Sequence, residues 1–209
     1  MDNNIAKESR DTERLILDAA MKEFSTKGYD GARTSSIAAE AGVTHAMLHY
    51  YFRSKEKLFE RIFKNKIKDI MEIVLNPILR SHGSLKERLR RGIESHFNLL
   101  MANETLPIFF VTTLNSRPSL YKDLIGELFT TSDMRIKALQ GEFDKAFENG
   151  EIKQVNAIML LADIAALNVF PFVATPVIMA MTGYSPERKT EFLEARRKEN
   201  VETILKRIS

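Results

Sequence analysis

Residues 34–59 read TSSIAAEAGVTHAMLHYYFRSKEKLF. Apolar residues with helical spacing, such as Ile37 and Ala41, precede Gly42, and a second helical run begins at Thr44. Glycine is favoured just after a helix ends, and threonine caps the first free N–H groups of the next helix. Two short helices joined by a turn of this length predict a helix-turn-helix unit.

The second of these helices has a distinctive outward face. A helical step of about 100° per residue turns Leu48 and Tyr51 inward and a second set of side chains outward. The outward set is His45, Ala46, His49 and Tyr50, with Met47 at the boundary. Short, polar and aromatic side chains on one helical face suit contacts with base edges and sugar-phosphate in the major groove. We therefore expect this face to bind DNA.

Two alternatives compete with DNA binding at this face. His45 and His49 lie four residues apart and share a helical face, which also suits a metal ion. A metal site needs more ligands, and the nearest residues on that face, Gly42 and Arg53, supply none, so no metal site is expected. A solvated face without a role remains open, because exposed histidine and tyrosine are common.

Cationic and hydroxyl side chains flank the outward face. Lys55 lies in the first turn of a helix that begins after its N-cap Ser54, where free N–H groups favour an anion. Arg33 and Ser35, with Thr34 as the expected N-cap, offer similar contacts at the start of the first short helix. Either cluster alone could be an ordinary cap. Together they predict two phosphate contacts that bracket a recognition helix.

The rest of the chain predicts an all-α fold. Its apolar residues recur with helical spacing, and no alternating β-branched run appears. A first helix is expected from Asp11, its N-cap, to Lys27, with Gly28 as the stop. A connecting helix is expected over residues 54–76, ending near Pro77. Further helices are expected at 85–97, 107–114, 120–128, 136–147, 157–181 and 186–208.

Composition narrows the functional classes. The 209 residues are 44% hydrophobic and 28% charged with a net charge of +3, which fits one large core and a small satellite domain. The chain has no cysteine, which excludes disulfides and thiol nucleophiles and fits a reducing, cytoplasmic location. The N-terminal residues MDNNIAKESRDTERL lack an apolar run, so no secretory signal is expected.

Residues 157–181 are apolar and long enough to span a bilayer. Asp163, Asn168, Pro171 and Pro176 argue against a membrane span, because charged groups and helix-breaking prolines are costly in lipid. We expect a helix that is apolar all round and therefore buried all round, or one at a helical interface.

The sequence lacks the elements of an enzyme active site. It has no phosphate-binding glycine loop, and His82 and His96 have no obvious acid partner motif. We therefore expect neither catalysis nor a cofactor.

The segment 34–59 resembles the N-terminal domain of the tetracycline-repressor (TetR) family of bacterial transcription regulators, and the resemblance covers about residues 10–60. Its landmarks are Gly28, Thr34, Ile37-Ala38, Ala41-Gly42-Val43, Thr44, Leu48, Tyr51-Phe52, Ser54-Lys55-Glu56 and Leu58. Three positions depart from the family pattern, which usually has tyrosine at His49 and often has glycine at Ala46 and threonine at Met47.

The resemblance implies a three-helix helix-turn-helix DNA-binding domain over residues 1–53. It also implies a larger helical ligand-binding and dimerisation domain over 54–209, which begins with the 54–76 connecting helix. A family member of this kind is a homodimer whose last two helices form a four-helix interface. It binds a palindromic operator, and a small-molecule inducer relieves repression.

The C-terminal region supplies candidate ligand and interface residues. Candidates for lining an apolar cavity are Met101, Phe109, Phe110, Phe129, Met134, Phe143, Met159 and Phe170. The same spacing suits plain core packing, and that alternative stays open. Candidates for the dimer interface are Asp163, Asn168, Phe192, Ile204 and Ile208. A DNA-binding dimer with a structural role and no inducer fits the N-terminal residues equally well, and only a real cavity separates the two hypotheses.

Overall fold

The computed structural model describes residues 2–116, 134–183 and 185–209, and these residues contain helices and no strand. The prediction of an all-α fold is confirmed. Contacts divide the described residues into one unit of 2–68 with 108–116 and a second unit of the remainder. The division falls inside α4 (Lys55–Arg80) and α6 (Thr105–Ser116), whereas the sequence places the domain boundary just before α4.

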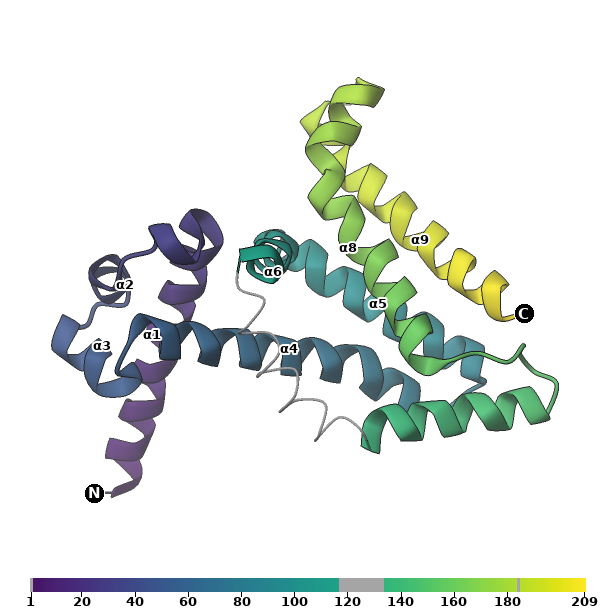
Figure 1. The fold of residues 1–209 in the computed structure, drawn as a ribbon, viewed down its shortest axis with the longest axis horizontal. Helices are drawn as coiled ribbons and strands as arrows, with labels where there is room; N and C mark the ends of the chain where they lie inside the picture. Colours follow the sequence, from purple (N-terminus) through teal and green to yellow (C-terminus); the bar gives the residue numbers. More distant parts are fainter. Residues whose placement is uncertain (1, 117–133, 184) are drawn as a thin grey trace. The chain divides into compact units, whose positions relative to one another are not determined.

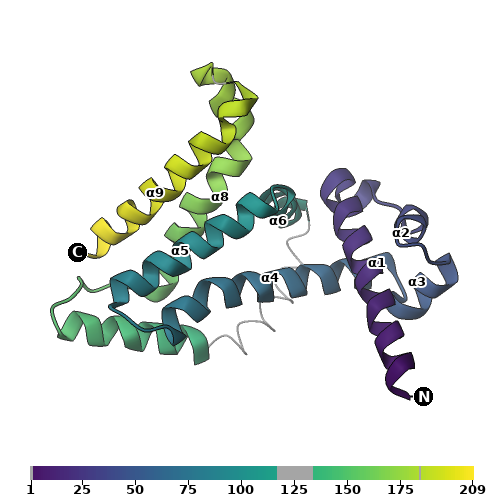
Figure 2. The ribbon, with the colours of Figure 1, turned by 180° about the vertical axis from the view of Figure 1, so that it is seen from behind.

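The first unit carries the helix-turn-helix (Figures 1 and 2). It consists of α1 (Asp2–Gly31), α2 (Thr34–Glu40), α3 (His45–Phe52) and parts of α4 and α6. Apolar faces of these helices share one core, because each short helix can bury its stripe only against the others. Core side chains include Ile16, Ala20, Phe24, Ile37, Ala38, Leu48, Phe52, Leu58 and Phe59.

Helix α1 differs from the expectation at its start. It begins at Asp2, and Asp11 lies inside it as an exposed residue whose carboxylate is 3.8 Å from the Arg14 guanidinium. The N-terminal turns gain a tertiary contact, because the Tyr51 hydroxyl donates to Ser9 Oγ at 3.2 Å. The predicted stop at Gly28 is confirmed: the residue has φ 67° and ψ 177°, which interrupt the helix there.

The N-caps around the turn were predicted in part. Thr44 caps α3 and accepts a hydrogen bond from the Met47 N–H at 3.1 Å, and Ser54 accepts from the Lys57 N–H at 3.1 Å. The expectation that Thr34 caps α2 is wrong. Arg33 occupies the cap position without a side-chain bond, and Thr34 is the first helical residue.

The second unit packs α5 (Leu85–Ala102), a helical segment at 134–148, α8 (Ala157–Thr182) and α9 (Lys189–Ile208), with a 3-10 turn at Pro186–Arg188. Helices α8 and α9 run side by side in opposite directions (Figures 1 and 2). Ser84 and Glu87 form a capping box that starts α5. The helix expected at 120–128 lies outside the described residues.

Prolines lie within two of the long helices, one of them at the position where the connecting helix was expected to end. Pro77 is inside α4, which continues to Arg80, and Pro171 and Pro176 are inside α8. Proline lacks an N–H, so Pro171 leaves the carbonyl of Leu167 without its helical donor. The Asn200 side-chain amide donates to that carbonyl at 2.7 Å, which compensates the loss.

Helix α8 is not buried all round, so that expectation is wrong. Ile164, Asn168 and Phe172 face the interior, where Asn168 is fully buried. Large apolar side chains on the same helix are exposed to solvent: Ile158, Met159, Phe170, Val173, Val177 and Met181. We call this set the α8 apolar stripe.

Candidate DNA-binding surface

The outward face of α3 is exposed as the sequence predicts. His45, Ala46 and His49 are exposed, as are Met47 at 41% and Tyr50 at 80%. Leu48 is buried, and it is joined in the core by Phe52, while Tyr51 is only half-buried. Sequence reasoning missed Phe52, although its spacing of four residues from Leu48 places both on one helical face.

A side-chain hydrogen bond links the starts of α2 and α3. Thr34 Oγ1 lies 3.0 Å from His45 Nε2. The His45 and His49 rings contact each other edge to face, with centroids 4.9 Å apart. Within the described residues no group of three or more potential metal ligands forms, so these two histidines have no third protein ligand there. The face therefore presents an ordered pair of imidazoles.

Lys55 contacts the protein on the side of α1. Its ammonium nitrogen lies 4.6 Å from the centroid of the Tyr29 ring and 3.3 Å from the carbonyl oxygen of Asp30. The cation–π contact and the hydrogen bond hold the charge at the N-terminus of α4. A phosphate contact by Lys55 remains a prediction.

Arg33 contributes its backbone to the packing of α2 on α1, while its side chain is exposed. The Arg33 N–H donates to Glu23 Oε1 at 3.2 Å, and Lys27 donates to the same oxygen at 2.9 Å. The bond from Lys27 holds the pKa of the Glu23 carboxyl below its ordinary value. Lys22 on α1 pairs with Glu40 on α2 at 2.5 Å.

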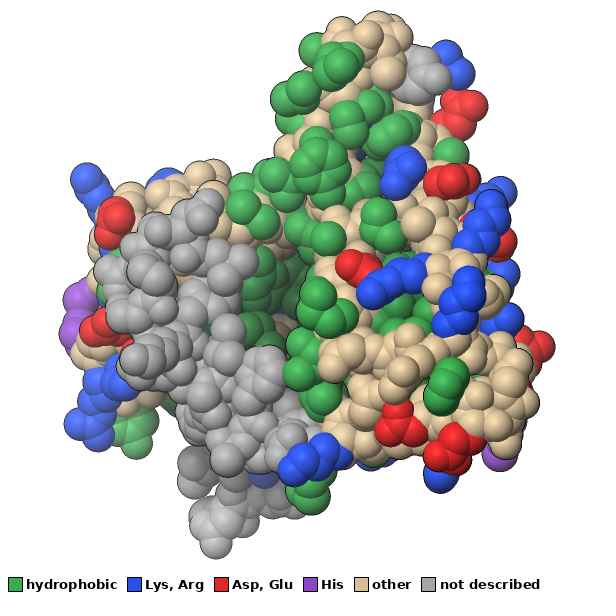
Figure 3. All heavy atoms as spheres, turned by 45° about the vertical axis from the view of Figure 1, so that its right-hand side comes forward, with side chains coloured by type: hydrophobic (Ala, Val, Ile, Leu, Met, Phe, Trp, Pro, Cys, Tyr) green, Lys and Arg blue, Asp and Glu red, His purple; other side chains and the backbone are tan. Residues whose placement is uncertain are grey.

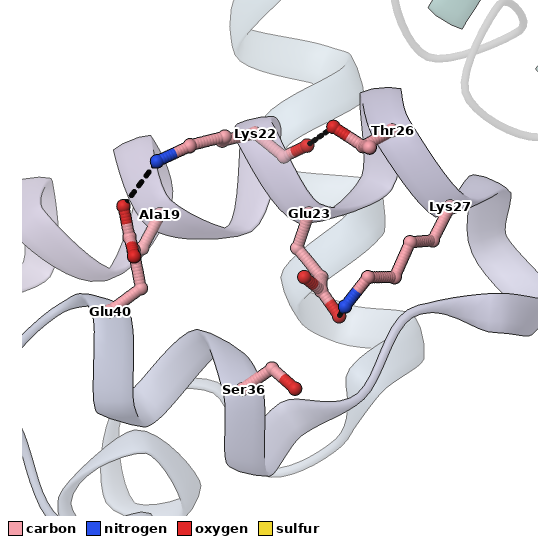
Figure 4. Close-up of a pocket in the computed structure, with 7 residues that line it drawn as sticks. All are labelled: Ala19, Lys22, Glu23, Thr26, Lys27, Ser36 and Glu40. Carbon is pink, nitrogen blue, oxygen red and sulfur yellow. Dashed lines mark hydrogen bonds and ion pairs between the residues drawn. The ribbon is translucent and has the colours of Figure 1, made fainter.

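Figure 4 shows the hollow between α1 and α2 that these charged side chains line. Its lining residues are Ala19, Lys22, Glu23, Thr26, Lys27, Ser36 and Glu40. The Lys22–Glu40 and Lys27–Glu23 pairs occupy its walls, so the charges already compensate one another. The Lys22–Glu40 pair joins the two helices, whereas the Lys27–Glu23 pair lies within α1. We assign the hollow no ligand.

The turn after α3 contains a strained residue. Arg53 has φ 62° and ψ −45°, and within the described residues it is the one non-glycine residue with positive φ. The Ser54 N–H donates to the Phe52 carbonyl at 2.6 Å across it, which is the hydrogen bond of a γ-turn. Residues other than glycine rarely adopt this backbone conformation, and no signal in the sequence predicted it.

Comparison with known proteins assigns the family. The family model described as bacterial regulatory proteins, tetR family, matches residues 16–62, which include α2 and α3. The fatty acid metabolism regulator protein of Bacillus subtilis (strain 168) is 31% identical over 150 residues, which cover 71% of this chain and 74% of that protein. The chain belongs to the TetR family.

Two further similarities extend over nearly the whole chain. The HTH-type transcriptional regulator RutR of Escherichia coli (strain K12) is 27% identical over 198 residues, covering 92% of this chain and 87% of that protein. The crystal structure of the transcriptional regulator FadR from Bacillus subtilis, in complex with stearoyl-CoA, matches with a TM-score of 0.67 and 26% identity. That match covers 94% of this chain and 99% of the other. This TetR-family chain is accordingly a transcriptional regulator.

Three of the candidate ligand residues of the TetR-family chain are exposed in the second unit. Met134, Met159 and Phe170 are exposed at 77%, 58% and 65%, so the prediction that they line an enclosed cavity is wrong for the described structure. The spacing of Met159 and Phe170 was compatible with a surface as well as with a cavity, because α8, which carries them, is apolar on several sides. Phe129 lies outside the described residues.

The remaining ligand candidates are covered by protein. Phe143 is buried in the core of the second unit, and Met101 is half-buried. Phe109 and Phe110 belong to the first unit, where both rings contact Phe63 and Phe109 also contacts Phe59. Whether these four face a ligand stays a prediction.

Three of the interface candidates are buried inside their own chain. Ile204 and Ile208 are part of the second unit's core at 1% and 0% exposure, so the prediction that they contact a second copy is wrong. Asn168 is also fully buried, and its bonding partners belong to the same chain. Asp163 pairs with Arg207 of its own chain, and Phe192 is half-buried.

Asn168 organises a buried polar chain between α5, α8 and α9. Its amide donates to the Ile93 carbonyl at 3.0 Å and lies 3.3 Å from His96 Nδ1, while Asn200 donates to Asn168 Oδ1 at 3.1 Å. An amide nitrogen can only donate, so His96 Nδ1 must accept and the ring is neutral. Burial lowers the pKa of His96 to about 4, in agreement with this arrangement.

Proposed function

We propose that this TetR-family regulator is a repressor that binds a palindromic operator as a homodimer and is released by an amphipathic ligand. The observation that carries the proposal is the exposed α3 face of His45, Met47, His49 and Tyr50. One helix in a major groove reads too few base pairs for genomic specificity. A second copy, bound about one helical turn away, supplies the remaining contacts. The protein would act in the cytoplasm, where the DNA is.

The α8 apolar stripe supports the proposal of a homodimer. Figure 3 shows hydrophobic side chains at the surface over this helix, and contiguous exposed apolar patches mark interaction sites. Helix α8 is long and apolar enough to cross a membrane by length and composition. Its Asp163–Arg207 ion pair and the buried Asn168 join it instead to polar groups of its own chain. A second copy of the chain therefore suits the stripe better than lipid does.

The similarity to fatty acid regulators supports a fatty acyl-CoA as the ligand. One relative is named a fatty acid metabolism regulator, and a structural neighbour is a complex with stearoyl-CoA. An acyl-CoA is amphipathic, with a long apolar chain and an anionic nucleotide end. Such a molecule would need both an apolar enclosure and cationic side chains.

Aromatic contacts in the first unit suggest how a ligand signal could reach the DNA. Phe109 on α6 lies 5.5 Å, centroid to centroid, from Phe59 on α4, and Phe59 lies 5.1 Å from Tyr29. Tyr29 in turn carries Lys55 over its ring. A shift of α6 would therefore disturb a packed series of rings that ends at a predicted phosphate contact.

Two measurements test the proposed function. Mapping of the binding sites of the protein in its own genome should find palindromic sites close to promoters, with higher transcription of the adjacent genes when the protein is deleted. Fluorescence anisotropy on such a site should show release by stearoyl-CoA and not by CoA or stearate alone. Sites without nearby regulated genes would favour a structural role, and indifference to every acyl-CoA would exclude this ligand class.

A further inference from the structure

The Thr34 side chain makes a contact that its position in the sequence did not predict. Its position at the first turn of α2 suits a phosphate contact or an N-cap, but its hydroxyl lies 3.0 Å from His45 Nε2. The side chain of Thr34 is half-buried, whereas those of the neighbouring Arg33 and Ser35 are exposed. The two bonded residues are eleven positions apart, so the contact bridges the first residue of one helix to the first residue of the next.

We propose that Thr34 is a positioning residue for base recognition: its hydroxyl fixes the orientation of the His45 ring, and His45 then reads the operator through Nδ1. The proposal rests on the proposed function only in assuming that the α3 face binds an operator. The hydrogen bond itself belongs to the free protein and is tested without DNA.

The chemistry of the two groups explains why the contact would matter. A hydroxyl can donate to a bare ring nitrogen or accept from a protonated one, so the contact occupies Nε2 in either tautomer of the neutral ring. Nδ1 is then the ring nitrogen that remains for a base. A donor at Nδ1 selects acceptors such as guanine N7, and an acceptor selects an exocyclic amine. The contact therefore decides which ring nitrogen is left to bind the operator.

Orientation is the second contribution. His45 is exposed and is the first residue of α3, so no earlier turn of that helix restrains its ring. The Thr34 hydroxyl on one side and the edge-to-face contact with His49 on the other restrict it. A side chain that is already ordered loses less conformational entropy on binding, and it discriminates better between correct and incorrect bases.

The test uses a matched set of substitutions. Thr34→Val removes the hydroxyl and keeps the β-branched shape, Thr34→Ser keeps the hydroxyl, and Thr26→Val makes the same change at an exposed threonine of α1 as a control. Each variant is tested against single-base variants of the selected operator and over a range of salt concentrations. We expect Thr34→Val to reduce discrimination about two- to tenfold at one base pair per half-site, with an unchanged salt slope. Thr34→Ser and Thr26→Val should retain the wild-type preference.

A double-mutant cycle with His45→Ala separates positioning from direct contact. The effect of Thr34→Val on base preference should vanish in the His45→Ala background, because Thr34 acts through that ring. An equal loss of affinity for all sequences with a lower salt slope would show that Thr34 contacts phosphate, and it would overturn the proposal. An undiminished effect without His45 would overturn it too.

NMR of the free protein tests the proposal without an operator. The ¹⁵N chemical shift of His45 Nε2 should differ between the wild type and Thr34→Val, because the variant loses the hydrogen bond at that nitrogen. Identical Nε2 shifts in the two proteins would contradict the proposal even if DNA binding were established. A changed Nε2 shift in a protein that binds no DNA would instead locate the failure in the proposed function.

Discussion

Helices α3 and α8 relate polarity to burial in opposite ways. On α3 the polar and aromatic residues His45, His49 and Tyr50 face outward, and Leu48 and Phe52 are buried. On α8 the polar Asn168 is fully buried, while Phe170, two residues further on, is 65% exposed. A helix with two chemically distinct faces shows its orientation in its sequence. A helix that is apolar on all sides does not, and its partners decide which side is inside.

The contrast between α3 and α8 shows that a buried polar residue can orient an apolar helix. Asn168 has partners on α5 and α9, and the alternative rotation of α8 would leave its amide without them. The α8 apolar stripe therefore faces outward, because turning it inward would break the buried hydrogen bonds of Asn168. Function on α3 depends on what is exposed, whereas packing of α8 depends on one buried amide.

The largest expected effect separates buried from exposed apolar positions near the C-terminus. Ile204→Arg places an unpaired charge in the core of the second unit, where Ile204 is 1% exposed, and should cost about 4 kcal/mol or more, so that little folded protein remains. Circular dichroism and thermal melting measure this loss. Phe170→Arg on the stripe is the matched control: the chain should stay folded and sediment as a monomer. If the Ile204→Arg variant were folded and dimeric, the assignment of Ile204 to the core would be wrong.

The second effect is a pH dependence of stability that comes from His96. Its folded-state pKa of about 4 lies below the ordinary 6.5, so between these values the unfolded chain binds the proton and the folded chain does not. Stability is complete above about pH 6.5 and should fall by about 3 kcal/mol as the pH approaches 4. Urea unfolding at several pH values measures the slope. His96→Gln should reduce it, whereas His82→Gln, at an exposed position, should leave it intact.

A smaller loss should follow from Asn168→Leu. The substitution removes the donor to His96 Nδ1 and the acceptor for Asn200, so buried polar atoms lose partners at a cost of about 2 kcal/mol. Asn98→Leu on α5 is the control, because Asn98 is exposed and its side chain accepts a hydrogen bond from Arg197. Chemical unfolding of both variants decides the matter, and equal losses would remove the special role of Asn168.

The smallest effect is a gain in stability at the end of α3. Arg53→Gly relieves the positive φ of 62° but adds backbone freedom to the unfolded chain, for a net stabilisation of about 1 kcal/mol or less. Arg53→Ala keeps the strain and should not be stabilising. A lower melting temperature for the glycine variant than for the alanine variant would argue that Arg53 is held by contacts rather than strained.

Local signals in the sequence predicted the first unit well because they act over a few residues. Thr44 and Ser54 cap their helices, and Gly28 ends the regular part of α1. Thr34 is the first residue of α2 rather than its cap, and its hydroxyl has a partner eleven residues away, which no local rule reveals. In the second unit we predicted that Ile204 lies at an interface, but it lies in the core. An apolar residue suits both places, so its type alone does not decide between them.

Selection of binding sites from random double-stranded DNA is the most direct test of operator recognition by a pair of α3 helices. Purified wild-type protein should enrich an inverted repeat whose half-sites are centred about one helical turn apart. His45→Ala should still bind but should lose preference at one symmetric pair of positions, because that side chain lies on the outward face of α3. An enriched site without inverted symmetry, or a site that is unchanged in the variant, would contradict recognition by a pair of α3 helices.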